Sequence, residues 1–269
     1  MNARVVRTIV LSVLMSLGAA SAYAQAAAQT PAKPYEPEVG QAGKDVVWVP
    51  TPQVLVDKML DMAKVTPQDF VMDLGSGDGR TVITAAKRGA RAMGIEYNPD
   101  MVELARRNAA AANVSDKATF EKADLFETDF SKAQVITMFL LPSINMKLRP
   151  QILDLRPGTR IVTNSFTMED WQADQSETVT DDCSNWCTAH LWIVPAKVEG
   201  TWQSPQGDLT LKQQFQMISG TLGSTAITEG RLRGDQIEFT VGKAKYTGRV
   251  AGNTISGTSG GAPWTATRR

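Results

Sequence analysis

Residues 71–80 read VMDLGSGDGR, and this stretch decides the fold. Apolar residues run up to Leu74, as in a short buried strand, and three glycines then follow at alternate positions. Glycine lets the backbone turn sharply and lets a ligand approach it closely. A strand, a glycine-rich turn and a helix in succession are typical of the sites where open α/β sheets hold nucleotides.

Two details of this turn favour a ligand other than a dinucleotide. Asp73 lies inside the motif, at the end of the strand, where a carboxylate repels a pyrophosphate and attracts a cationic amino-acid group. The glycine spacing is G-S-G-D-G and not G-x-G-x-x-G. S-adenosylmethionine (SAM), a zwitterion with a sulfonium, therefore suits the turn better than NAD. The cofactor residues predicted here are Asp73, Gly75, Ser76, Gly77, Asp78 and Gly79.

Two further acidic residues follow the next two predicted strands. Glu96 ends the strand Arg91–Glu96 and can accept hydrogen bonds from both ribose hydroxyls. Asp124, with Leu125 beside it, follows the strand Ala118–Lys122 and is expected to face the adenine amino group. Each acid alone could be a cap or a solvated strand end, but in this order they predict one SAM site.

Strand and helix patterns alternate from Val46 onward, which implies βαβ units and a parallel sheet. The last two strands are joined by a short connection, which forces them antiparallel. We therefore predict an α/β domain over residues 45–196, with a Rossmann-like, mostly parallel sheet that ends in an antiparallel hairpin. Strands are expected at 70–74, 91–96, 118–122, 134–139, 160–164, 177–180 and 189–194, and helices from Thr51 as N-cap and at 81–88, 100–112 and 144–153.

After Val198 the composition shifts to Gly, Thr and short alternating runs. Residues 230–237 and 248–255 align as two copies of a strand, a Gly-Asp or Gly-Asn turn and a second strand, which is a hairpin signature. Residues 197–269 are therefore predicted to form a small antiparallel β domain. The Arg-Gly-Asp tripeptide at 233–235 is explained by the hairpin turn.

The first 24 residues have the order of a secretory signal peptide. Arg4 and Arg7 precede an apolar run, and small residues offer cleavage after Ala24. The run over residues 8–20 is too short for a membrane-spanning helix. We expect a periplasmic or secreted protein without a stable membrane span. Residues 25–44, rich in Ala, Gln, Pro and Gly, are predicted to be a flexible linker.

Cysteines and charge limit the other possibilities. Cys183 and Cys187 would be able to pair in an oxidising compartment, the alternative being two free thiols. With His190 they could be considered a metal cluster, but no fourth ligand lies nearby, so no metal site is predicted. Lys and Arg total 28, as do Asp and Glu, so no basic excess indicates a nucleic-acid partner.

The array formed by residues 73–80, Glu96 and Asp124 resembles Class I SAM-dependent methyltransferases over residues 46–195. With VPTP at 49–52 and FLLP at 139–142, it is similar to the group that contains the mitochondrial ATP-synthase c-subunit lysine methyltransferase and its bacterial relatives. This resemblance implies methyl transfer from SAM, with a protein lysine as one acceptor. The β domain is not part of the resemblance.

Methyl transfer depends mainly on positioning, because SAM already carries a good leaving group. A lysine acceptor must lose its proton, and desolvation lowers its pKa. Thr51, Leu140, Leu141 and Pro142 are predicted to lie near the substrate, although the last three could be ordinary core and a helix start. The Asn-Pro-Pro-Tyr signature of adenine and glutamine methylation is absent there, and we identify no catalytic base. The alternatives are a small-molecule methyltransferase and a SAM-binding module without turnover.

Overall fold

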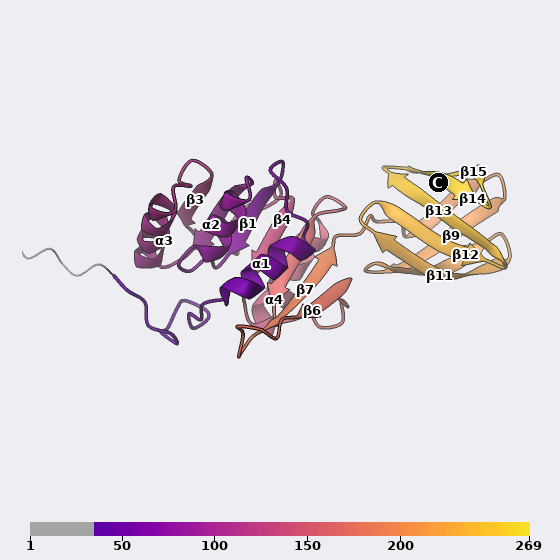
Figure 1. Ribbon diagram of the computed structural model, residues 1–269. Helices are drawn as coiled ribbons and strands as arrows, with labels where there is room; N and C mark the ends of the chain where they lie inside the picture. The colour runs from indigo at the N-terminus through magenta and orange to yellow at the C-terminus, as the bar shows by residue number, and fades with distance from the viewer. Residues whose placement is uncertain (1–34) are drawn as a thin grey trace, which may run out of the picture. The chain divides into compact units, whose positions relative to one another are not determined.

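The computed structural model, which describes residues 35–269, contains a seven-stranded sheet whose central strands are short apolar runs (Figure 1). The strand order is β3-β2-β1-β4-β5-β7-β6. Strands β1 to β5 pair in parallel, and β7 runs antiparallel to both β5 and β6. The antiparallel pairing of β6 with β7 was predicted from their short connection. The strands are β1 (Phe70–Leu74), β2 (Arg91–Glu96), β3 (Ala118–Lys122), β4 (Val135–Met138), β5 (Arg160–Asn164), β6 (Gln175–Thr178) and β7 (Thr188–Ile193).

Apolar side chains cover both faces of this sheet. Neighbouring strand residues point to opposite faces, so Val71 packs in one core cluster and Met72 in another. The first cluster holds the buried faces of the first three helices, and the second holds that of the fourth. The helices are α1 (Gln53–Met62), α2 (Arg80–Lys87), α3 (Pro99–Ala111) and α4 (Pro142–Leu153). Because both faces of the sheet are covered, all four residues of β4 are buried, and three of them are apolar.

The start of α1 differs from the prediction. Pro52, not Thr51, is the N-cap, and no side chain caps the helix. The Thr51 hydroxyl instead accepts a hydrogen bond from Asn164 Nδ2 at 3.3 Å, at the end of β5. The Thr51 hydroxyl therefore binds a residue that is distant in the sequence and does not cap the helix, although its local capping preference would predict that it does.

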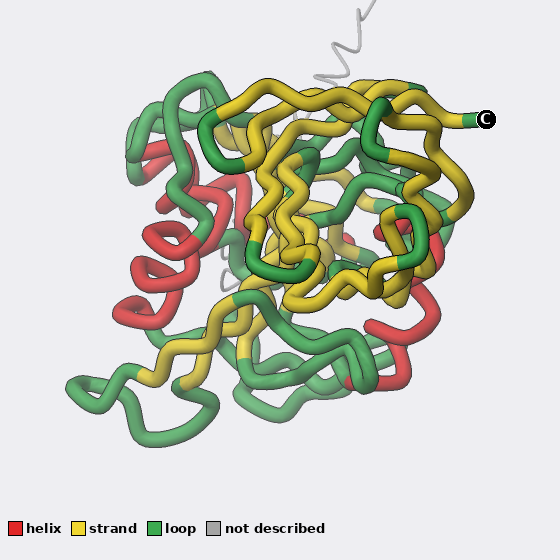
Figure 2. The backbone as a smooth tube through the Cα atoms, turned by 90° about the vertical axis from the view of Figure 1, so that its right-hand side faces the viewer, coloured by secondary structure: helices red, strands yellow, loops and turns green. Residues whose placement is uncertain are grey.

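Residues after Val198 form a closed antiparallel barrel, where the sequence predicted only a small antiparallel β domain. Figure 2 shows its strands (yellow) joined by short loops (green). The two predicted repeats form the β11–β12 and β13–β14 hairpins. The barrel strands are β8 (Gly200–Ser204), β9 (Gly207–Gln214), β10 (Met217–Leu222), β11 (Thr225–Arg233), β12 (Gln236–Val241), β13 (Ala244–Ala251), β14 (Thr254–Ser259) and β15 (Ala262–Arg268).

The barrel has a core of its own. Phe239 stacks on Tyr246 with ring centroids 5.0 Å apart, and Trp264 meets both rings edge-on. Trp202 is fully buried and donates its indole N–H to the Val198 carbonyl at 2.8 Å. Large aromatic side chains therefore fill the barrel, which leaves its interior packed.

A small set of contacts joins the barrel to the sheet domain. Phe215, at the β9–β10 turn, stacks on the buried Trp171 with centroids 5.7 Å apart. Arg231 forms a 2.6 Å ion pair with Asp174, whose side chain is completely buried. The proposed domain boundary lies close to Ala196, whose side chain already belongs to the barrel core.

The N-terminal region is described only in part. The predicted signal peptide and residues 25–34 of the predicted linker lie outside the described residues. Residues 40–48, which overlap the end of that linker, differ from the prediction of a flexible segment. They form a hydrogen-bonded turn in which Gly40 N donates to the Trp48 carbonyl and Trp48 N to that of Gln41, both at 2.9 Å. Within residues 35–269, no helix is long and apolar enough to cross a membrane.

Candidate active site

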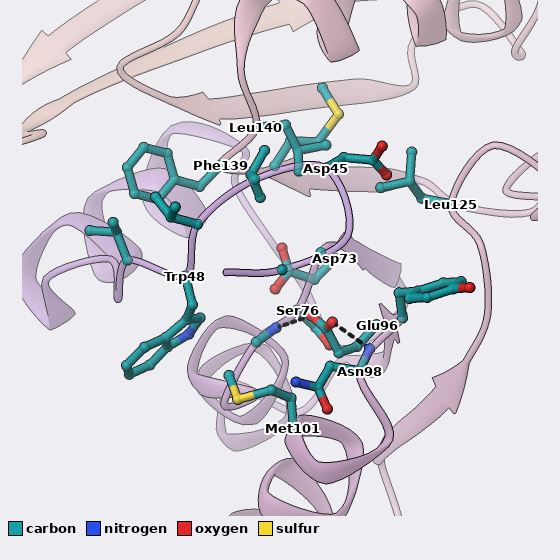
Figure 3. A pocket seen from close by; sticks show the side chains of 18 of the residues that line it. Asp45, Trp48, Asp73, Ser76, Glu96, Asn98, Met101, Leu125, Phe139 and Leu140 are labelled. Carbon is teal, nitrogen blue, oxygen red and sulfur yellow. Dashed lines mark hydrogen bonds between the residues drawn. The ribbon is translucent and has the colours of Figure 1, made fainter. Parts of the chain in front are cut away.

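A cavity of about 560 Å³ opens where β1, β2 and β4 end, as Figure 3 shows from close by. Parallel strands place their carboxyl ends at one edge, which is where open α/β sheets bind ligands. Residues 41–51, which we call the strap, form one side of the cavity. Of the predicted site residues, the cavity is lined by Asp73, Gly75, Ser76, Gly77, Asp78, Glu96, Asp124, Leu125, Thr51, Leu140 and Leu141.

The glycine-rich turn follows β1. Its first two amides, those of Gly75 and Ser76, donate to the Ile95 carbonyl on β2 at 2.9 and 3.0 Å. Gly77 has φ +53°, and a Cβ there would lie 2.7 Å from the Trp48 indole nitrogen of the strap. A side chain at this position would therefore collide with the strap as well as strain the backbone.

Asp73 is buried in the floor of the cavity and accepts a hydrogen bond from Thr137 Oγ1 at 2.6 Å. Burial raises its pKa to about 7, and the nearby charges of Asp78 and Glu96 add to the rise. Within the described residues this buried carboxylate forms no ion pair, which favours a ligand that brings a positive charge. In the view of Figure 3, Asp73 lies between Glu96 on one side and Phe139 and Leu140 on the other.

Ser76 and Glu96 add hydrogen-bonding capacity beside Asp73. The Ser76 hydroxyl is buried and has no hydrogen-bond partner within the described residues. Glu96 accepts the Gly77 amide at 3.0 Å and the Asn98 amide at 2.9 Å, one on each carboxylate oxygen. These two amides fix the carboxylate, while each of its oxygens keeps a further lone pair for a ligand.

Asp124 is already paired. Its carboxylate forms a short ion pair with Lys44 of the strap, which keeps the pKa of Asp124 low, and it accepts the Phe126 amide at 3.0 Å. The Lys44 ammonium also lies over the Tyr97 ring, 4.8 Å from its centroid. The strap thus reaches the part of the cavity where the adenine contact is predicted.

Asp78 and Arg80 fasten the strap from the other end. Their side chains form an ion pair at 2.6 Å, and Arg80 Nη1 donates to the Thr51 carbonyl at 2.8 Å. Because Arg80 opens α2, this contact ties the end of the strap to the turn that follows β1.

Two of the predicted site residues do not line the cavity. A Cβ at Gly79 would lie 2.7 Å from the Phe120 ring of β3 and 2.9 Å from Ala105 of α3. The absence of a side chain at Gly79 therefore allows α3 and β3 to pack closely against the start of α2. Pro142 is the first residue of α4, where its fixed φ suits a helix start. Both residues lie at the start of a helix, Gly79 at that of α2 and Pro142 at that of α4, and they take part in the helix rather than in the cavity wall.

The aromatic wall of the cavity was not predicted from the sequence. Phe139, Phe166 and Trp186 line it from three separate loops, and Trp48 lines it from the strap. Phe139 lies within the FLLP stretch, of which the sequence analysis assigns only the two leucines and the proline to the site. Trp186 lies between the two cysteines, and a large aromatic residue inside a predicted disulfide loop was the one feature of the sequence that pointed to this wall.

The cysteines form a disulfide, Cys183–Cys187, and so are not metal ligands. Within the described residues, no group of three or more His, Cys, Asp or Glu side chains is placed to hold a metal ion.

Comparison with known proteins adds to this geometry. The profile of the ANTKMT methyltransferase domain matches residues 73–175. A protein-lysine N-methyltransferase of Saccharolobus islandicus is 40% identical over 152 residues, covering 55% of this chain and 94% of the relative. The ATP synthase c-subunit lysine N-methyltransferase of Mus musculus is 36% identical over 107 residues, covering 39% of this chain and 43% of the relative. The chain thus spans less than half the length of that mouse relative.

A solved structure is also similar. The crystal structure of an RNA methyltransferase from Salinibacter ruber in complex with S-adenosyl-L-homocysteine is 45% identical, with a TM-score of 0.53. The similarity covers 56% of this chain and 96% of that one. The barrel lies beyond the residues that the methyltransferase profile matches.

Proposed function

Because this chain belongs to the family of SAM-dependent methyltransferases that includes the protein-lysine N-methyltransferase of Saccharolobus islandicus, we propose that it methylates the side-chain amine of a protein lysine. The observation that carries this proposal is the charge of the cavity. Five acidic residues line it against two basic ones, and both bases are already ion-paired. An acidic cavity attracts a cationic acceptor and opposes the phosphates of a nucleic acid. The acids are Asp45, Asp73, Asp78, Glu96 and Asp124, and the bases are Lys44 and Arg80.

The residues of the cavity suit SAM. Asp73 would hold the amino group of its methionine part, and the unpartnered Ser76 hydroxyl would find a polar partner there. Glu96 would accept the ribose hydroxyls, and Asp124 and Leu125 would border the adenine. When bound, SAM supplies a methyl group that leaves its sulfonium for the acceptor, and the sulfur keeps the electron pair of the broken bond.

On the acceptor side the chain supplies apolar walls. Phe139, Leu140 and Leu141 follow β4 and line the cavity beside the cofactor residues. Removing water from a lysine ammonium lowers its pKa and counteracts the rise that the nearby carboxylates cause, so that the amine loses its proton to solvent before it acts as nucleophile. Holding the neutral amine in line supplies the remaining rate enhancement, and no catalytic base is assigned.

Binding and transfer are tested separately. Isothermal titration with SAM measures the cofactor site, and radiolabelled methyl transfer in an extract identifies the acceptor class. Label in protein, retained on lysine after hydrolysis, supports the proposal. Label in extractable small molecules or in RNA would contradict the lysine assignment, and SAM binding without any transfer would favour a module without turnover.

We also propose that the mature chain starts near Gln25 and works outside the cytoplasm. The basic, apolar and small residues at the start support this, as does a disulfide, because disulfides persist in oxidising compartments. SAM is made in the cytoplasm, so an exported enzyme needs a source of it. The intact mass of the protein from the cell envelope is expected to show cleavage and no alkylatable thiol. A full-length chain with two alkylatable thiols would contradict the proposal.

A further inference from the structure

Three aromatic rings that line the cavity, those of Phe139, Phe166 and Trp186, meet one another. Phe166 lies 5.9 Å from Phe139 and 5.2 Å from Trp186, measured between ring centroids. Phe139 and Trp186 are 6.0 Å apart, so all three rings touch one another. Trp186 is nevertheless 45% exposed, which is unusual for a side chain of its size. An exposed aromatic cluster that lines a functional cavity indicates a contact with a ligand.

The backbone around these rings is held in costly conformations. Trp186 has φ +58° and Ser165, beside Phe166, has φ +57°. A left-handed conformation is unfavourable for residues with a side chain, and above all for a bulky one such as Trp186. Such conformations persist only where the surroundings enforce them, and they gather at ligand sites.

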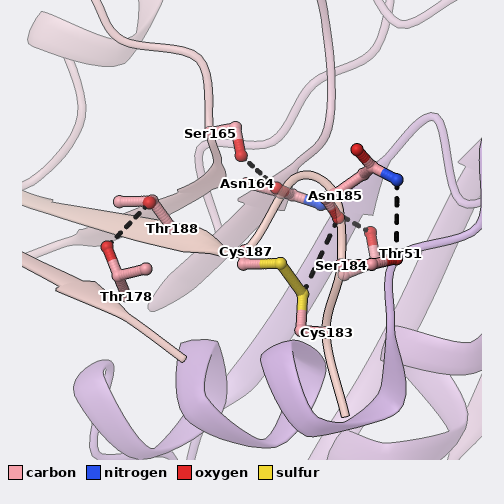
Figure 4. The surroundings of a disulfide bond; sticks show 9 residues. All are labelled: Thr51, Asn164, Ser165, Thr178, Cys183, Ser184, Asn185, Cys187 and Thr188. Carbon is pink, nitrogen blue, oxygen red and sulfur yellow. Dashed lines mark hydrogen bonds between the residues drawn. A yellow bond between two sulfur atoms is a disulfide. The ribbon is translucent and has the colours of Figure 1, made fainter. Parts of the chain in front are cut away.

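The surroundings that enforce them include the Cys183–Cys187 disulfide, which Figure 4 shows together with Ser165 and Thr188. The disulfide closes residues 183–187 into a short loop that carries Trp186. The Val179 amide donates to the Cys187 carbonyl at 2.9 Å, which ties this loop to the residue that follows β6. On the other side, the Ser165 amide donates to the Thr188 carbonyl at 2.7 Å, and Thr163 Oγ1 donates to the Phe166 carbonyl at 2.5 Å.

We propose that Phe139, Phe166 and Trp186 form an aromatic receptor for the ammonium group of the acceptor, and that the Cys183–Cys187 disulfide holds Trp186 in it. The rings lie too close together to admit a cation between them, so the ammonium lies over the surface that they turn to the cavity. The face of an aromatic ring attracts a cation, most strongly when water is removed. A methylated ammonium suits this surface best, because its charge is spread over apolar methyl groups.

This receptor rests on the proposed lysine methylation and adds a specificity to it. Products that already carry methyl groups would be retained between transfers, which favours repeated methylation of one amine. Reduction of the disulfide would release the loop and weaken the receptor. Acceptor binding therefore depends on the redox state of the protein, through a bond that lies outside the predicted cofactor residues.

The receptor can be tested without turnover. The probe is a capped trimethyl-lysine, and its partner is the neutral isostere in which carbon replaces the side-chain nitrogen. Their affinities for the full chain are compared by NMR titration in the presence of S-adenosylhomocysteine. We expect the cation to bind about 3- to 10-fold more tightly, since the two probes differ only in charge. Equal binding would overturn the proposal.

Variants then locate the effect. Trp186→Ala is expected to abolish the preference for the cation, whereas Trp186→Phe keeps part of it. Met217→Ala is the matched control, because Met217 is a large apolar residue of the barrel with 49% exposure. The paired change Cys183→Ser with Cys187→Ser is expected to behave like Trp186→Ala, and so is reduced parent protein. A preference that survives in Trp186→Ala, or in both disulfide-free samples, would overturn the assignment.

Two further measurements separate this proposal from the function on which it rests. Thermal unfolding of each variant shows whether a lost preference reflects a lost fold, and Trp186→Phe gives a second reading if Trp186→Ala does not fold. Titration with S-adenosylhomocysteine alone tests the cofactor site. Failure of that titration contradicts the proposed function, whereas failure of the probe comparison contradicts only the receptor.

A nucleotide probe tests the alternative that the rings stack on a base. Tighter binding of a nucleoside monophosphate than of trimethyl-lysine would indicate base stacking and overturn the receptor.

Discussion

Glu96 illustrates how one residue can serve both the fold and the ligand. Its carboxylate accepts the Gly77 and Asn98 amides, which orients it toward the cavity. Strand β2 could be predicted to end at Glu96 because its apolar run stops there. The two amide contacts could not, since they depend on how the turns after β1 and β2 come together.

Replacing Glu96 by Ala is expected to weaken SAM binding by roughly 30-fold or more, which corresponds to about 2–4 kcal/mol from two lost hydrogen bonds to a charged group. Titration calorimetry measures the change. Glu96→Gln keeps the size and one acceptor oxygen, and should lose less. Glu121→Ala, which removes an exposed carboxylate from the neighbouring strand β3, is the matched control. Parental affinity in Glu96→Ala would disprove the ribose assignment.

Asp73 predicts how SAM binding depends on pH. Burial raises its pKa to about 7, so the side chain is mostly protonated at pH 6 and mostly ionised at pH 7.5. Only the ionised form attracts the SAM ammonium, so affinity should rise with pH over this range. The expected gain is about an order of magnitude. Titrations at the two pH values measure it.

The control for this pH dependence is Asp73→Asn. It keeps the shape of the side chain but cannot ionise, so it should bind SAM weakly and with little change between the two pH values. A bound ammonium stabilises the ionised form, so SAM binding to the parent should release a proton near pH 6.5. An affinity that falls as pH rises would contradict the role of Asp73.

Among the elements, strands were easier to predict than the strap. Strands β1, β2, β3 and β5 match the predicted bounds. Strands β1, β2 and β5 are built around short apolar runs, whereas β3 alternates the apolar Ala118 and Phe120 with polar residues. Residues 41–44, the first part of the strap, were predicted to belong to a linker because the contacts that hold the strap in place come from residues far away in the sequence. Lys44 binds Asp124 and Trp48 covers Gly77, and neither partner can be read from local composition.

Gly77→Ala tests the contact between the turn and the strap. Its cost should include the left-handed backbone, about 1–2 kcal/mol, and the displacement of Trp48, which a Cβ would meet at 2.7 Å. Gly252→Ala is a matched control, because Gly252 has φ +57° with nothing within 4 Å of the added carbon. Urea unfolding gives both free energies. We expect Gly77→Ala to be the more destabilising and to weaken SAM binding. Equal losses in the two variants would show that the strap contact contributes nothing.

At the scale of the whole molecule, the sequence indicated a second unit but not its closure. The change in composition at Val198 and the two hairpin repeats predicted an antiparallel β domain. Closure depends on β15 pairing with β8, the last strand with the first, through a short register at Thr267 and Arg268. No local pattern announces such a pairing, because it joins strands at the two ends of the unit.

The barrel should be dispensable for SAM binding, since all of the predicted cofactor residues precede it in the chain and line the cavity of the sheet domain or pack beside it. A chain that ends at Pro195 tests this, because Ala196 already packs in the barrel core. Its SAM affinity should stay within about twofold of the parent, less than 0.5 kcal/mol. Its stability should fall, because Trp171 loses the Phe215 ring and the buried Asp174 loses Arg231. In the full chain, Arg231→Met removes the ion pair alone and should cost about 1–3 kcal/mol. The shortened chain and Arg231→Met together decide between two roles of the barrel. If the shortened chain folds, keeps its SAM affinity and labels different acceptors, the barrel recruits substrate.

If Arg231→Met still folds but the shortened chain is insoluble or no longer binds SAM, the sheet and the barrel form one folding unit, and the proposed boundary is wrong.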